Sequence, residues 1–215
     1  MSENNFKCNS IDLARASYLL LDKAAAFGDS LGFTLDPQLS QDNTMVFIDK
    51  RTNQPTIVHR GSVTPRDWLV DDLLISAGSN HETQRLRRAR QITAAAEAKY
   101  RTKSNAVGHS LGGRLAELAG SGGQIVTFNR ASGLGDVGLG RNQPHNRNRN
   151  GSRQTDVRTK LDLVSALSNL GLGRRPASQP PVVEVRQRDQ ANRFLPGPVR
   201  FLANVAKAHG LRNLK

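Results

Sequence analysis

The sequence predicts an α/β fold with a mostly parallel central sheet and helices on both of its faces. Short apolar runs of strand length alternate along the chain with stretches whose apolar residues recur every three or four positions. Strands that alternate with helices favour a parallel sheet that is covered on both sides. The chain has 215 residues, of which 37% are hydrophobic, and this suits one core. A single domain spanning residues 1–215 is therefore predicted.

The first part of the chain predicts a helix followed by a hairpin. Residues 10–27 have helical spacing, with Ser10 as a candidate cap and Gly28 as a candidate stop. Met45–Asp49 and Thr56–His59 are strand-like, and residues 51–55 between them are turn-prone. We expect these two strands to form an antiparallel hairpin.

The next part predicts helices. Residues 67–75 have helical spacing, and residues 79–82 form a capping-box pattern at the start of a long amphipathic helix. The apolar positions of that helix are Leu86, Ala89, Ile92, Ala96 and Tyr100. Its arginines at positions 85, 87, 88 and 90 are interpreted as a solvated face.

Four more strand-like runs follow, with helical segments between them. The strands are predicted at Asn105–Val107, Gln124–Phe128, Thr155–Thr159 and Val182–Val185, and the helices at Leu111–Ala119 and Leu163–Leu170. A segment at 133–152, rich in Gly, Asn and Arg, is predicted to be a mobile surface loop. A second loop is predicted at 171–181, and neither loop separates parts large enough to be domains.

The composition restricts partners and compartment. Lys and Arg total 31 against 18 Asp and Glu, which gives a formal net charge of +13 and predicts attraction to phosphates or anionic lipid head groups. Cys8 is the only cysteine, which excludes a disulfide within the chain and favours a reducing, intracellular setting. The apolar run 17–27 is interrupted by Asp22 and Lys23, so neither a signal peptide nor a membrane span is predicted.

The strongest chemical signal is a Gly-x-Ser-x-Gly motif placed between a strand and a helix. Gly108, His109, Ser110, Leu111 and Gly112 make up the motif. A serine on such a sharp turn has strained backbone angles, and the glycines allow the turn to approach neighbouring elements closely. This context favours a nucleophile elbow that presents the Ser110 hydroxyl above the sheet.

Two separated segments resemble the class 3 lipase family of the α/β-hydrolase superfamily. Val107–Gly113 is similar to that family's elbow, and Val58–Ser62 together with Asp67–Asp72 resembles its upstream segment. Thr127–Asn129 resembles the strand after the elbow. The resemblance implies a small α/β-hydrolase fold and a serine esterase or lipase acting on acyl esters of lipids. Trp68 is interpreted as structural.

A serine nucleophile needs a histidine base that a carboxylate orients, in the chain order Ser, Asp, His. Downstream of Ser110 the candidate bases are His145 and His209. His145 lies in the predicted loop, whereas His209 follows an amphipathic stretch at 199–208. His209 is therefore the predicted base.

The candidate orienting acids are Asp136, Asp156, Asp162 and Asp189. Asp162 follows the predicted strand Thr155–Thr159 and resembles the family's acid at the end of a strand, so it is the predicted triad acid. A helix N-cap is the alternative role for this residue.

The oxyanion of the tetrahedral intermediate needs N–H donors, and in this fold one comes from the residue after the nucleophile, here Leu111. The resemblance implies that Ser62 supplies the second. The predicted reaction is acyl-ester hydrolysis through an acyl-enzyme. No metal-ligand or cofactor-binding pattern is present in the sequence, so no cofactor is predicted.

Several alternatives remain open. Phospholipid at an anionic membrane is one option for the substrate. The same triad also suits acyl transfer to another acceptor. A catalytically inactive hydrolase scaffold that binds nucleic acid or a virion-like assembly through its net charge is the main alternative function. The segment 133–152 is interpreted either as a lid or as a surface linker.

Overall fold

The computed structural model describes residues 3–41, 43–61, 84–130, 153–159 and 182–185. Four helices lie in these ranges: α1 (Glu3–Ala16), α2 (Leu21–Ser30), α4 (Gln84–Tyr100) and α5 (Leu111–Ala119). The strands are β1 (Phe33–Leu35), β2 (Thr44–Asp49), β3 (Pro55–His59), β4 (Asn105–His109), β5 (Gln124–Phe128), β6 (Arg153–Thr159) and β7 (Val182–Val185).

The strands form one mixed sheet whose spatial order, among the described strands, follows the chain from β1 to β7. β1, β2 and β3 are antiparallel neighbours, and every pair from β3 to β7 is parallel. Val58 of β3 pairs with Val107 of β4, which pairs with Val126 of β5. The mostly parallel sheet and the hairpin of β2 and β3 are therefore confirmed.

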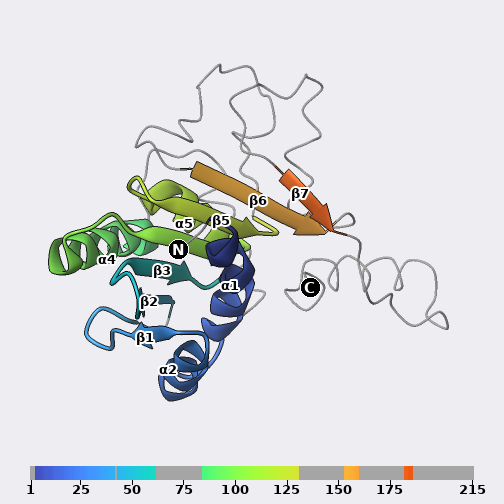
Figure 1. The fold of residues 1–215 in the computed structure, drawn as a ribbon. Helices are drawn as coiled ribbons and strands as arrows, with labels where there is room; N and C mark the ends of the chain where they lie inside the picture. The colour runs from blue at the N-terminus through green and yellow to red at the C-terminus, as the bar shows by residue number, and fades with distance from the viewer. Residues whose placement is uncertain (1–2, 42, 62–83, 131–152, 160–181, 186–215) are drawn as a thin grey trace.

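Helices cover both faces of the sheet, because alternate strand residues point to opposite sides. Figure 1 shows α1 and α2 on one side and α4 and α5 on the other. On the first side, Phe47, Val58 and Val107 pack with Leu13 of α1. On the second side, Ile57 packs against Ile92 of α4. Burial on both faces explains why these strands are apolar runs and do not alternate with polar residues.

The single helix predicted for residues 10–27 is wrong, because the structure has two helices separated by a link at residues 17–20. In this link, Tyr18 N–H and Leu19 N–H bond carbonyls three residues back, and Leu20 is extended with ψ 153°. Ser10 lies inside α1 and caps no helix end. Gly28 lies inside α2, where the Phe47 ring leaves no room for a Cβ.

The sequence analysis also missed the edge strand β1. It follows Gly32, whose φ of +84° makes the turn out of α2, and its Phe33 pairs with Asp49 of β2. The strand was missed because it has only three residues, and so short a run shows little periodicity.

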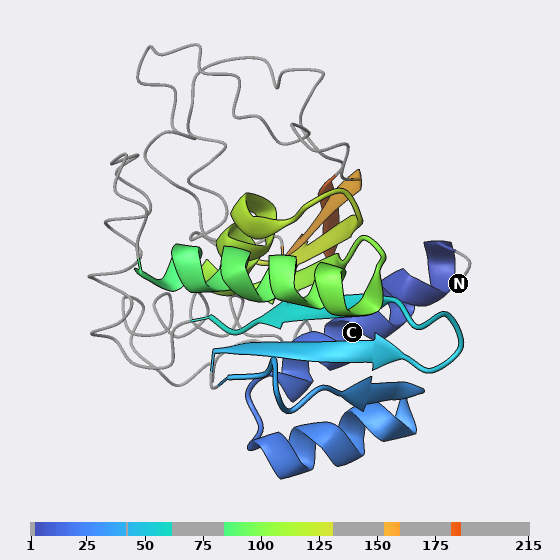
Figure 2. The same cartoon turned by 90° about the vertical axis from the view of Figure 1, so that its left-hand side faces the viewer.

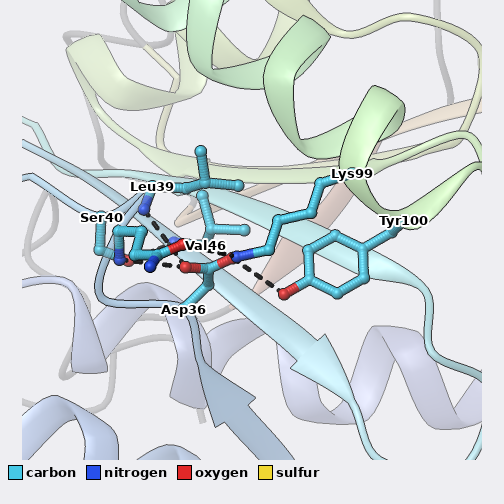
Figure 3. A network of polar contacts seen from close by, with 7 residues as sticks. Asp36, Leu39, Ser40, Val46, Lys99 and Tyr100 are labelled. Atoms are coloured by element: carbon cyan, nitrogen blue, oxygen red, sulfur yellow. Dashed lines mark hydrogen bonds and ion pairs between the residues drawn. The ribbon is translucent and has the colours of Figure 1, made fainter.

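After β1, the chain is tied to the end of α4 by the carboxylate of Asp36 (Figure 3). Lys99 Nζ and Tyr100 Oη donate to it at 2.7 and 2.8 Å, and the Leu39 amide donates at 3.3 Å. Burial raises the pKa of Asp36, but these hydrogen bonds outweigh burial and leave the pKa below its usual value. The link fixes the antiparallel edge of the sheet against α4.

The other predicted elements fall into two groups. The long helix, α5 and the strands β4, β5, β6 and β7 are confirmed. The bounds that can be compared differ by at most two residues, and the predicted start of the long helix at residues 79–82 lies outside the described residues. The predicted helices at 67–75 and 163–170 and the loops at 133–152 and 171–181 lie outside the described residues. No helix in the described ranges has the length and apolar character needed to cross a membrane.

Candidate active site

Ser110 lies on the sharp turn between β4, which ends at His109, and α5, which begins at Leu111. Its φ is 56° and its ψ is −125°, a conformation that costs a non-glycine residue about 1–3 kcal/mol. The turn is held from both sides, because Ser110 N–H donates to the Phe128 carbonyl at 3.0 Å and the Ser110 carbonyl accepts from Gly113 N–H at 3.0 Å. The surrounding fold therefore keeps Ser110 in its strained conformation.

The two motif glycines lie where the turn meets other backbone. A Cβ on Gly108 would be 2.1 Å from the Gly112 carbonyl oxygen, and a Cβ on Gly112 would be 2.1 Å from the His59 carbonyl oxygen. Neither neighbour is a movable side chain. These contacts give the physical reason for glycine at both positions, as the motif predicts.

The chain that leaves β3 runs beside the Ser110 turn. A Cβ on Gly61 would be 2.8 Å from the His109 carbonyl oxygen and 3.0 Å from Ser110 Cβ. Ser62 follows Gly61 directly in the chain. Leu111 is the first residue of α5, so its N–H has no acceptor within the helix.

Tyr18, in the link between α1 and α2, contacts both sides of this turn. Its hydroxyl accepts from the Gly61 amide at 3.1 Å and lies 2.7 Å from His109 Nδ1. The Tyr18 and His109 rings also meet edge to face. Sequence analysis missed Tyr18, because its contacts are 43 and 91 residues away along the chain and no local pattern marks them.

Tyr18 is a neutral phenol at neutral pH. Burial raises its pKa, and the Gly61 hydrogen bond and the charges of Arg60 and Arg85 only partly oppose this. Since the hydroxyl already accepts from Gly61, its own proton is available to His109 Nδ1. The Tyr18 hydroxyl thus joins His109, which precedes Ser110, to Gly61, which precedes Ser62.

A buried charge cluster lies behind the turn, on the α5 side of the sheet. Glu117 of α5 pairs with Arg114 at 2.6 Å and with Arg130 at 3.1 Å. Arg130 Nε lies 3.6 Å from Asp156 Oδ2, and the other oxygen of this carboxylate, Oδ1, accepts from Thr127 Oγ1 at 2.7 Å. Asp156, one of the four candidate acids, is therefore held inside this cluster.

His59, beneath the turn, is fully buried. Its Nδ1 lies 3.0 Å from Thr44 Oγ1. Burial, helped by the charge of Arg85, lowers the pKa of His59 to about 3. His59 is therefore neutral at physiological pH and supports the turn without carrying charge.

The buried state of His59 predicts a pH dependence of stability. Because the unfolded chain takes up this proton near pH 6.5 and the folded protein only near pH 3, the contribution of His59 is complete above pH 6.5 and declines as the pH falls toward 3. We expect the free energy of unfolding to drop by about 2 kcal/mol between pH 6.5 and 5. Urea unfolding at both pH values measures it.

The variant His59→Gln is the control for this prediction. It removes the titrating group and keeps a polar side chain beside Thr44. The free energy of unfolding should therefore depend less on pH between 6.5 and 5. Asp36 contributes only at lower pH, since its pKa lies below the usual carboxyl value. If the free energy of unfolding depended on pH equally in wild type and His59→Gln, His59 would be ruled out as the cause of that dependence.

The structure describes five of the predicted site residues and brings them together on one turn: Gly108, His109, Ser110, Leu111 and Gly112. Ser62, Asp162 and His209 lie outside the described residues, as do the alternatives Asp136, Asp189 and His145. Within the described part of the chain, no three His, Cys, Asp or Glu side chains gather in a way that would hold a metal ion.

Comparison with known families identifies the chain. The family model described as "Phospholipase-like: Tle-like phospholipase domain" matches residues 25–204. The chain belongs to this family. A search of curated proteins finds no match.

The fold of this Tle-like phospholipase domain is also that of fungal lipases. A fungal lipase in an inhibitor complex, studied as a model for interfacial activation, matches with a TM-score of 0.57 and 17% identity over 88% of this chain and 82% of that chain. The Rhizomucor miehei lipase in a complex with its propeptide matches with a TM-score of 0.53 and 16% identity over 88% and 68%. The α/β-hydrolase fold and the resemblance to class 3 lipases are therefore confirmed.

Proposed function

We propose that this phospholipase-like domain is a serine hydrolase that cleaves acyl esters of lipids, with Ser110 as nucleophile. The observation that carries the proposal is the conformation of Ser110, at φ 56° and ψ −125° between β4 and α5. A fold holds a serine in such a conformation at a cost, and strain of this kind is concentrated at functional sites. The phospholipase-like family supports an ester substrate.

In the proposed reaction, His209 takes the proton from Ser110 Oγ, and Oγ attacks the ester carbonyl carbon. Asp162 orients the histidine. The oxyanion is held by the Leu111 N–H and by Ser62, which directly follows the glycine that packs against Ser110. The histidine then gives its proton to the departing alcohol, and water releases the acyl group from Ser110.

Phospholipid is the substrate that we favour over neutral glyceride. The family description names phospholipase, and the net charge of +13 favours a surface that carries phosphate head groups. Acyl transfer uses the same residues, and it would appear as product formation that requires an added alcohol.

The experiment combines turnover of short-chain p-nitrophenyl esters with labelling by a serine-directed phosphonate. His209→Ala and Asp162→Asn test the two remaining triad positions, with His145→Ala and Asp189→Asn as matched controls on the alternatives. We expect labelling at Ser110 and turnover that falls by about 10³-fold or more in His209→Ala and in Asp162→Asn, but not in His145→Ala or Asp189→Asn. A folded wild type with neither turnover nor labelling would favour the scaffold function, whose signature is salt-dependent nucleic-acid binding.

Tyr18→Phe is expected to lower kcat by about tenfold and to change KM by less than about twofold. The variant keeps the ring but leaves the Gly61 amide without its acceptor, and Gly61 packs against Ser110. Ester kinetics measure the two constants. Tyr100→Phe is the control, since it removes a phenol hydroxyl that bonds Asp36, away from Ser110, and should leave kcat unchanged. A kcat that fell equally in both variants would contradict a positioning role for Tyr18.

A further inference from the structure

Three consecutive leucines are exposed in the link between α1 and α2 and at the start of α2. Leu19, Leu20 and Leu21 have 39%, 69% and 38% of their surface exposed. Among the residues whose burial the structure describes, no other large apolar side chain is exposed. A contiguous exposed apolar group marks an interaction site more often than a lone exposed leucine does.

The leucines follow directly after the residue that contacts the Ser110 turn. Tyr18 Oη and Ser110 Cβ both lie within 3.0 Å of the position that a Cβ would take on Gly61, so they are at most twice that distance apart. The next three residues are the leucines. Figure 2 shows α1 crossing the face of the sheet, with the link at its far end. The apolar surface therefore adjoins the candidate active site.

We propose that Leu19, Leu20 and Leu21 dock this domain on an anionic lipid surface by inserting into its interfacial layer. The inference rests on the proposed function, because an ester held in a membrane reaches Ser110 only if the turn faces the lipid. The net charge of +13 attracts an anionic surface at long range. The leucines then add the short-range apolar contact, and Tyr18 ties them to the turn.

The main test uses a variant with Leu19→Ser, Leu20→Ser and Leu21→Ser. Leu20 is the residue that precedes α2 as its N-cap, and serine is a preferred residue there, so the helix should be preserved. We expect binding to vesicles of phosphatidylglycerol and phosphatidylcholine, measured by co-flotation, to fall by about tenfold. Turnover of a soluble p-nitrophenyl ester should change by less than about twofold, since none of these three leucines is placed in the catalytic machinery.

A second readout reports insertion directly. Leu20→Trp should show a blue shift of fluorescence on addition of the same vesicles and quenching by brominated lipid, both relative to the wild-type signal of Trp68. Thr52→Trp is the matched control. Thr52 is exposed in the turn before β3, at the opposite end of that strand from Gly61, and should show no shift.

The outcomes separate this inference from the proposed function. Unchanged vesicle binding in the triple variant, or an equal shift in Thr52→Trp, overturns lipid docking while ester turnover still supports the hydrolase. Leucine-dependent binding without any ester turnover leaves the docking in place and removes the proposed function. A triple variant that binds vesicles normally but loses a dimer seen in wild type by light scattering would assign the leucines to a second copy of the chain.

Discussion

Ser110→Gly is expected to abolish ester turnover, with a fall of about 10³-fold or more, and at the same time to raise the free energy of unfolding by about 1 kcal/mol. The φ of 56° at this position is unfavourable for serine and accessible to glycine. Relief of that strain should exceed the entropy that the unfolded chain gains from glycine. Ester kinetics and urea unfolding of the same preparation measure both effects.

Two further variants separate the hydroxyl from the backbone. Ser110→Ala removes the nucleophile but keeps a Cβ, so it should be inactive without the gain in stability. Asn53→Gly relieves a similar φ of 58° in the turn before β3 and should be slightly more stable with full activity. Turnover by Ser110→Gly within about tenfold of wild type would exclude Ser110 as the nucleophile, whatever its stability.

The Ser110 turn could be predicted from the sequence because its determinants are local. A buried strand, a glycine on each side of the serine and a helix-forming stretch occupy twelve consecutive positions, 105–116. The steric demand at Gly108 is met by Gly112 within the same segment. Local determinants of this kind can be recognised in a single sequence without any knowledge of the tertiary fold.

The link between α1 and α2 could not be predicted, since its causes lie elsewhere in the molecule. The pattern from residue 10 to 27 is compatible with one helix, but Phe33 and Phe47 are covered by a separate α2 in the structure. Tyr18 reaches Gly61 and His109 only because α1 ends where β3 and β4 end. The sequence distance between these partners removes any local signal.

The charge cluster was missed for a related reason. Arg114 and Glu117 lie on α5, Arg130 follows β5 and Asp156 lies on β6, and each of them alone is typical of a solvated surface residue. Burial makes each charge dependent on the others, because an unpaired charge in this position would be strongly destabilising. The contacts of Asp156 with Arg130 and Thr127 could therefore be found only in the structure.

Gly112→Ala is expected to lower the free energy of unfolding by about 3 kcal/mol or more and to abolish turnover. The new Cβ would lie 2.1 Å from the His59 carbonyl oxygen and 2.6 Å from its carbon, and this backbone is fixed by pairing between β3 and β4. The turn must then shift away from β3, which separates Ser110 from the chain that leads into Ser62. Urea unfolding and ester kinetics measure the two losses.

Gly32→Ala is the matched control, since Gly32 has no atom within 4 Å of its Cβ position but has a φ of +84°. Its substitution introduces backbone strain without a clash, so we expect a cost of about 1 kcal/mol and unchanged turnover. If Gly112→Ala lowered the free energy of unfolding no more than Gly32→Ala does, close contact between the turn and β3 would not be the reason for glycine at position 112. A larger cost with turnover retained would mean that this contact stabilises the fold without positioning Ser110.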